Sequence, residues 1–264
     1  MLSPQVESLI TVQMAHPFQN RLLRALSAAD LALVLPHLES VRLQYRQALE
    51  TAQEQIEFVY FPETALGSVV AGKEAGSSID VGLFGRDGMS GTSLVQGDSR
   101  SAFDCITAIE GYAMRISADN LQDAMRQSAS LKSLMAHYAR ALGIQTTYTA
   151  WANAEMKLEQ RLARWILMVD DRIDDHRFRV THEFIAIILG VRRAGVTVAL
   201  KRLEEQRLIK IERREICVLD RDGLINLTMG SYGPAEVEYQ RLIQNWSDGA
   251  TMEEVQRPRA VEPV

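Results

Sequence analysis

The chain has 264 residues, of which 47% are apolar and 24% are charged. This composition excludes fibrous, collagen-like and wholly disordered proteins, and the length suits two domains better than one small disulfide-stabilised module. The 29 Lys and Arg residues against 34 Asp and Glu give a net charge of -5, which taken alone argues against a nucleic-acid-binding protein.

The two cysteines, Cys105 and Cys217, form no CxxC pair. They cannot build a disulfide framework, a zinc ribbon or an iron–sulfur ligand set. No apolar stretch approaches the ~20 residues that a membrane helix needs, and the first 16 residues lack the cationic start of a secretory signal. We therefore expect a cytoplasmic protein without a membrane segment.

Two short amphipathic helices are predicted within residues 20–35, with Asp30 near the start of the second, before Pro36 marks a break. Between residues 41 and 117 the pattern changes to short alternating apolar runs that are separated by Gly and Asp. Many short strands about ten residues apart are typical of an antiparallel barrel or sandwich. We predict an N-terminal β-structure that follows two small helices.

A long helix is predicted over residues 131–165, where there is no Pro and only one Gly, Gly143. Residues that alternate spacings of four and three form a seam along it: Leu134, Tyr138, Ala141, Gln145, Tyr148 and Ala152. This seam either packs on the chain's own β-structure or forms an interface between two chains. We expect the interface, because aromatic and small residues share the seam and the helix is longer than a small barrel needs.

A helix, a turn, a second helix and a hairpin are predicted in the C-terminal half. Thr181 can cap the first helix, with Glu183 in its first turn, and Gly190 stops it. The second helix runs over about residues 192–206 and buries Val196, Leu200 and Leu203. Residues 209–218 alternate around a charged tip and indicate a β-hairpin. This order is the plan of a winged helix-turn-helix, whose second helix enters the major groove of DNA.

The outward residues of the second helix are candidates for DNA contact rather than a merely solvated surface. They are Arg192, Arg193, Thr197 and Lys201. An Arg there can bind guanine O6 and N7 with both arms of its guanidinium, and Lys201 can meet a phosphate. Arg213 and Arg214 are either plain hairpin-tip residues or a wing that touches the DNA backbone.

This organisation resembles the Crp/Fnr superfamily of bacterial transcription regulators over about residues 20–225. The segments EQRLARWIL (159–167) and THEFIAIILGVRRAGVT (181–197) carry the specific local match. The resemblance implies an α+β fold with an N-terminal antiparallel β-barrel of the jelly-roll, cyclic-nucleotide-binding-like type, a long dimerisation helix and a C-terminal winged helix-turn-helix. It also implies a homodimer that binds a DNA operator with two-fold symmetry and contacts RNA polymerase.

The resemblance divides the chain into four parts. Residues 1–130 would form the sensor barrel with its N-terminal helices, and residues 131–155 the dimerisation helix. The winged helix-turn-helix would span residues 156–225. A C-terminal extension would follow over residues 226–264, with an end that we expect to be mobile because it is polar and holds two prolines.

Base recognition is expected to differ from that of familiar members of the superfamily. These commonly carry Ser-Arg-Glu-Thr-Val-x-Arg at the start of the recognition helix, which matches residues 192–198 here. Arg193 stays as the guanine-reading candidate, but Ala194 replaces the Glu and Val198 replaces the later Arg. Thr181 and His182 match positions that touch phosphate, as helix N-termini favour.

The sensor is expected not to bind cyclic AMP in the usual way. Superfamily members that bind cyclic nucleotides use a Glu for the ribose and an Arg about ten residues later for the phosphate. Arg100 and Ser101 fit the phosphate end, but Met89 or Ser90 stands in place of the Glu. The alternatives are another nucleotide or small-molecule effector near Arg100, a sensor that acts mainly through protein partners, or an Arg100 that is an ordinary surface residue.

No cofactor, metal site or enzymatic activity is expected. The five His residues have no spacing that nominates a haem ligand, and the acidic residues within 170–175 fit a solvated loop better than a metal site. No Walker, HExxH or GxSxG motif occurs. Residues 157–215 hold 14 Lys and Arg against 10 Asp and Glu, a net charge of +4 that the whole-chain sum conceals.

Overall fold

The computed structural model describes residues 18–72, 79–213 and 215–244. Arg214 and residues 245–264, which include the end that we expected to be mobile, lie outside this description. The strands of the N-terminal half are β1 (Glu39–Leu43), β2 (Ala48–Glu50), β3 (Phe58–Pro62), β4 (Leu66–Ala71), β5 (Ile79–Phe84), β6 (Asp104–Ile109) and β7 (Gly111–Ser117). The predicted run of short strands is therefore confirmed.

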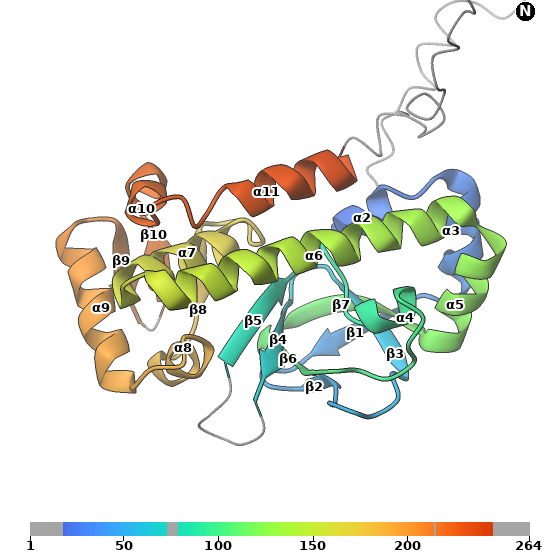
Figure 1. The fold of residues 1–264 in the computed structure, drawn as a ribbon, viewed down its shortest axis with the longest axis horizontal. Coiled ribbons are helices and arrows are strands. Elements are labelled where there is room, and N and C mark those ends of the chain that lie inside the picture. Colours follow the sequence, from blue (N-terminus) through green and yellow to red (C-terminus); the bar gives the residue numbers. More distant parts are fainter. Residues whose placement is uncertain (1–17, 73–78, 214, 245–264) are drawn as a thin grey trace, which may run out of the picture.

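These strands form two antiparallel sheets, in the orders β1-β7-β3 and β2-β6-β4-β5 (Figure 1). Within the described residues no strand of one sheet pairs with a strand of the other, so the structure is a jelly-roll-like sandwich and not a closed barrel. Its core includes Val59, Phe61, Phe84 and Ile116, all at most 2% exposed. The alternation of apolar side chains along the strands places them on the inner faces.

Small polar residues begin most of the N-terminal helices. Asn20 caps α2, Ser27 caps α3 and Ser128 caps α6 by accepting hydrogen bonds from backbone N–H groups of the first turn. The helices of this half are α2 (Arg21–Arg24), α3 (Ala28–Val34), the 3-10 turn η1 (Leu35–His37), α4 (Thr92–Val95), α5 (Ala118–Gln127) and α6 (Ala129–Glu155). The long predicted helix is thus real, although it ends at Glu155 and α7 continues the chain after a break.

The seam of α6 packs inside the chain. Leu134, Tyr138, Ala141, Gln145 and Ala152 are buried, and Tyr148 is half-buried beside Trp151, with ring centroids 6.2 Å apart. Of the two alternatives for these side chains, the structure favours packing on the chain's own elements, against our expectation of an interface. The reason is that α6 lies between the sheets and the C-terminal helices, which cover two of its sides and leave another side exposed (Figure 1).

The C-terminal half contains the predicted helix, turn, helix and hairpin. Its elements are α7 (Leu158–Asp170), β8 (Arg177–Arg179), α8 (His182–Ile188), α9 (Arg193–Glu205), β9 (Ile209–Glu212), β10 (Glu215–Val218), α10 (Arg221–Leu227), α11 (Pro234–Tyr239) and the π-helical turn η2 (Gln240–Gln244). Strand β8, which we did not predict, follows the acidic residues 170–175 and pairs with β10 in the order β8-β10-β9. A strand of three residues is too short to show an alternation of apolar and polar side chains in the sequence, which is why β8 was not predicted.

The C-terminal extension folds back over α6 and the sandwich. Leu242 and Ile243, at 7% and 2% exposure, belong to the same core as Phe61 and Leu134. The hydroxyl of Tyr239 donates to the carbonyl oxygen of Asp87 at 2.7 Å. Helix α11 and the turn η2 therefore pack on the N-terminal half.

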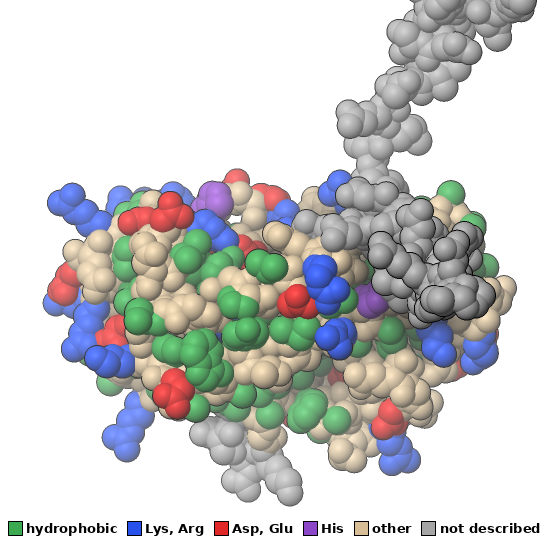
Figure 2. All heavy atoms as spheres, turned by 45° about the horizontal axis from the view of Figure 1, so that its top comes forward, with side chains coloured by type: hydrophobic (Ala, Val, Ile, Leu, Met, Phe, Trp, Pro, Cys, Tyr) green, Lys and Arg blue, Asp and Glu red, His purple; other side chains and the backbone are tan. Residues whose placement is uncertain are grey.

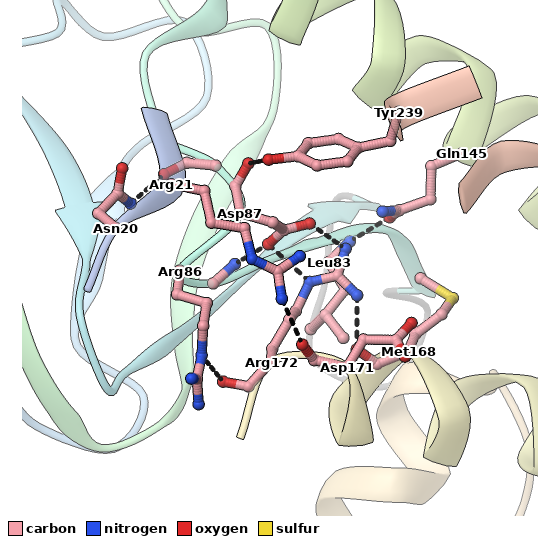
Figure 3. Close-up of polar contacts among 12 residues, drawn as sticks. Asn20, Arg21, Leu83, Arg86, Asp87, Gln145, Met168, Asp171, Arg172 and Tyr239 are labelled. Carbon is pink, nitrogen blue, oxygen red and sulfur yellow. Dashed lines mark hydrogen bonds and ion pairs between the residues drawn. The ribbon is translucent and has the colours of Figure 1, made fainter. Parts of the chain in front are cut away.

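A buried ion pair joins the two halves of the chain. Asp87 lies in the loop after β5, and Arg172 lies just after the end of α7. Arg172 Nε donates to Asp87 Oδ1 at 2.8 Å and Nη2 to Oδ2 at 2.5 Å, with both side chains nearly inaccessible (Figure 3). Burial alone would lower the pKa of Arg172, but the carboxylates of Asp87 and Asp171 raise it, so the guanidinium stays charged.

Further contacts surround this pair. Arg172 Nη1 donates to the carbonyl of Met168, and the N–H of Gly85 donates to Asp87 Oδ1 at 2.9 Å. Arg86 Nε donates to the carbonyl of Arg172 at 2.9 Å, as Figure 3 shows. The pair is therefore hydrogen-bonded on both sides, which is the condition under which two buried charges are tolerated.

Replacement of Arg172 should reveal how much the junction contributes. Arg172→Ala leaves the Asp87 carboxylate buried without its partner, and we expect the free energy of unfolding to fall by about 3–5 kcal/mol in urea denaturation. Arg42→Ala is the control, because Arg42 and Glu110 are 65% and 61% exposed and lie 3.8 Å apart. The control should lose less than about 1 kcal/mol. Equal small losses in both variants would contradict a structural role of the pair.

Candidate nucleic-acid interface

Helix α8 begins and ends as the sequence predicts. The Thr181 hydroxyl accepts a hydrogen bond from the N–H of Phe184 at 3.1 Å, and Glu183 lies in the first turn. Gly190 follows the helix with φ +61°, a left-handed conformation that other residues adopt at a cost. A Cβ at Gly190 would also lie 3.3 Å from the Ile79 side chain of β5. The turn between the two helices therefore requires glycine.

Helix α9 buries one side and exposes the other. The buried residues are Val196, Ala199, Leu200 and Leu203, of which we predicted all but Ala199. Arg192, Arg193, Thr197 and Lys201 are exposed, as predicted. Neither Arg192 nor Arg193 forms a salt bridge with any described residue, so both guanidinium groups are available to an anionic partner.

The outward residues differ in how they are held. The Thr197 hydroxyl donates to the carbonyl of Arg193 at 3.2 Å and lies 3.0 Å from Nδ1 of His182 on α8. Lys201 Nζ lies 3.6 Å from Glu205 Oε1. Arg202 pairs with Glu159 and so connects α9 to α7. The side of α9 near α8 is therefore ordered by internal hydrogen bonds, and Lys201 is partly neutralised by its neighbour.

A hollow of about 400 Å³ brings several predicted residues together. It lies between the N-terminus of α8, the first turn of α9 and the wing, and Thr181, His182 and Arg193 line it with Ile211 and Ile216. The wing is the hairpin of β9 and β10. Arg213 stands at its tip with φ +50° and forms no salt bridge with a described residue. Three of the predicted contact residues therefore share one concave surface.

The sandwich also touches the helix-turn-helix. The rings of Tyr45 and Phe184 meet edge to face with centroids 5.4 Å apart. Beside them a groove of about 870 Å³ runs between the sheet and α8, and its lining includes Arg46, Glu50, Glu183 and Arg192. No local pattern could have predicted this contact, because Tyr45 and Phe184 are far apart in the sequence.

The predicted ligand residues Arg100 and Ser101 are not brought together. The Arg100 residue is exposed, whereas Ser101 is 5% exposed and its hydroxyl donates to Glu50 Oε2 at 2.7 Å. The N–H of Gly91 donates to the other Glu50 oxygen at 2.7 Å. Burial raises the pKa of Glu50, and these hydrogen bonds oppose the rise. The Glu50 carboxylate therefore already accepts the hydrogen bonds that the Gly91 N–H and the Ser101 hydroxyl could donate to a ligand.

The residues in the position of the expected ribose-binding Glu are also inside the protein. Met89 is fully buried, and Ser90 is 3% exposed, with its Oγ accepting a hydrogen bond from the N–H of Tyr60 at 3.0 Å. Sequence reasoning missed Glu50, because it lies about fifty positions before Ser101. Glu50 lies on β2, and no local pattern in the sequence marked it as a residue of this site.

The acidic residues at the end of α7 and just after it form ion pairs. His176 Nδ1 lies 2.8 Å from Asp170 Oδ1, and Arg221 pairs with Asp170 and Asp171. No group of three or more His, Cys, Asp or Glu side chains in the described ranges is placed to hold a metal ion. None of the described helices has the length and hydrophobicity to span a membrane.

Known proteins share the helix-turn-helix and the overall fold of this chain. Residues 160–227 match the family described as the Crp-like helix-turn-helix domain. Similar solved structures include a protein assigned to the Crp/Fnr family of transcriptional regulators from Eubacterium rectale, with 17% identity and a TM-score of 0.60 over 79% of this chain and 98% of that protein. No curated protein matches the chain.

Two further structures have the same fold. FixK2 from Bradyrhizobium japonicum has 15% identity and a TM-score of 0.61 over 72% of this chain and 96% of that protein. A CRP-family transcriptional regulator from Thermus thermophilus has 19% identity and a TM-score of 0.57 over 72% of this chain and 97% of that protein. The predicted fold class and resemblance are therefore confirmed.

Proposed function

We propose that this chain, which belongs to the Crp/Fnr superfamily by its fold and its Crp-like helix-turn-helix domain, is a dimeric transcription regulator that binds double-stranded DNA sequence-specifically. The observation that carries the proposal is the grouping of Thr181, His182 and Arg193 around one hollow beside the wing. The role is regulatory rather than enzymatic, with an operator of two-fold symmetry and RNA polymerase as partners.

Most of the candidate contact residues have a role that their chemistry supports. Arg193 in the first turn of α9 reads a guanine in the major groove, since a guanidinium matches guanine O6 and N7. Thr181, His182, Arg192 and Lys201 contact the DNA backbone, and Arg213 contacts it from the wing. The net charge of +4 over residues 157–215 is modest, so we infer that affinity depends on a few specific contacts.

Arg193→Ala should weaken binding to the cognate site by about 1–3 kcal/mol and relax discrimination at one base pair. The cognate site is obtained by selection from random DNA, and binding is measured by fluorescence anisotropy. Lys201→Ala is the comparison, because loss of a phosphate contact weakens binding to all sequences alike. Full retention of affinity and specificity in Arg193→Ala would show that α9 does not read the operator.

We infer that two chains meet along the exposed side of α6 and not along the predicted seam. The exposed residues are displaced from that seam by two positions and again alternate spacings of four and three: Ala136, Arg140, Gly143, Thr147, Ala150 and Ala154. Such a pattern is that of a two-helix interface, and small side chains allow close approach. Trp151, 41% exposed, lies beside it. In Figure 2, hydrophobic side chains gather across the middle of the face that comes forward.

Gly143 offers a direct test of this interface. A Cβ at Gly143 would meet no atom within 4 Å, so a larger side chain fits the single chain. We expect Gly143→Arg to convert the dimer into a monomer in sedimentation equilibrium and to keep its helical circular dichroism. Gly143→Ala adds one carbon and should stay dimeric. A Gly143→Arg protein that remains a dimer would place the interface elsewhere.

The sensor, we further infer, does not bind cyclic AMP in the usual way. Support comes from the Glu50 carboxylate, which already accepts the hydrogen bonds of Gly91 and Ser101. A phosphate brought to the same donors would be repelled by this charge. Titration calorimetry with cyclic AMP and cyclic GMP should give no heat of binding. Heat that is lost in Arg100→Ala would contradict this inference and support an effector at Arg100.

A further inference from the structure

The middle of the exposed side of α9 is apolar. At about 100° per residue, the direction opposite the buried stripe of α9 falls on Ala194, Val198 and Lys201. Arg193 and Thr197 lie on the flank that contacts His182, and Arg202 lies on the other flank, held by Glu159. Val198 is 51% exposed, and Ala194, one turn earlier, is exposed as well.

Folding of the chain does not account for Val198. Isolated exposed apolar residues are common on protein surfaces. A β-branched residue, however, is a weaker helix former than Arg, Lys or Glu, and Val198 lies on a side of α9 where it gains little packing in return. Arg193 precedes Ala194 and Val198 in the sequence, and Lys201 follows them. Two cations therefore border an apolar patch. We define Ala194 and Val198 as the apolar patch of α9.

We propose that the apolar patch of α9 reads thymine methyl groups, so that each half of the operator carries thymine where the patch faces the major groove. The inference rests on the proposed DNA-binding function and specifies its substrate. Of the groups that the four standard bases present in the major groove, only the C5-methyl of thymine is apolar. Neither Ala194 nor Val198 has a side-chain donor or acceptor with which to read another base.

The size of the patch limits how many base pairs it can read. Residues one turn apart are separated by about 6 Å along a helix, and base pairs are about 3.4 Å apart along DNA. The patch therefore spans about two base-pair steps. Arg193 lies next to Ala194 in the first turn of α9. The half-site should therefore contain guanine next to or near these thymines. At the other end, Lys201 and its partner Glu205 are 75% and 62% exposed and mark the end of the apolar surface.

Deoxyuridine provides the test, because it lacks only the methyl group of thymine. In the operator selected by the full chain, each thymine of a half-site is replaced in turn by deoxyuridine. We expect one or two positions to lose about fourfold in affinity, the effect of one buried methyl group. In Val198→Ala the loss at one of these positions should disappear, while the preference for guanine remains.

Val237→Ala is the matched control. Val237 on α11 is 61% exposed and lies outside the helix-turn-helix, so its replacement should leave every thymine-to-uracil ratio unchanged. Equal affinity for thymine and uracil at all positions, or an unchanged ratio in Val198→Ala, would overturn the inference and leave the DNA-binding function standing. Failure of the full chain to select any sequence would overturn the proposed function itself.

Discussion

The buried ion pair between Asp87 and Arg172 is the constraint on which the arrangement of the two halves depends. It connects a loop of the sandwich to the end of α7, the helix that leads into the helix-turn-helix. Two charges removed from water are stable only when paired and hydrogen-bonded, and here Gly85 and Met168 supply additional hydrogen bonds. The contact therefore favours one orientation of α8 and α9 relative to the sheets.

Residues after the hairpin of β9 and β10 make further contacts beside this pair. Arg221 at the start of α10 pairs with Asp170 and Asp171 at 2.6 and 2.5 Å, and the hydroxyl of Tyr232 donates to Asp171. Tyr239 then reaches the backbone of Asp87. A rotation of the helix-turn-helix against the sandwich would break the contacts of Arg172 with Asp87 and of Arg86 with the carbonyl of Arg172. In the dimer that we propose, such a rotation would change the distance between the two recognition helices, which would have to match a turn of DNA.

The two surfaces assigned to partners were predictable to different degrees. The cap at Thr181, the stop at Gly190 and the buried stripe of α9 all follow from the sequence, because each depends on residues within one or two turns. The predicted seam of α6 lies two positions away from the side that this helix exposes. Both sides alternate spacings of four and three, and the more apolar side is the one that the single chain buries. From the sequence, Val198 was only a departure from the superfamily pattern. The structure shows that it lies in the middle of the exposed side of α9.

Local patterns therefore sufficed for most of the strands and helices, for the winged helix-turn-helix and for which side of α9 is exposed, because caps, periodicity and turns depend on neighbouring residues. Tertiary structure alone decided what covers each face. Glu50 reaches Ser101 across 51 positions and Arg172 reaches Asp87 across 85. Such contacts leave no periodic signal, since burial and charge pairing across the chain depend on how the elements pack rather than on which elements form.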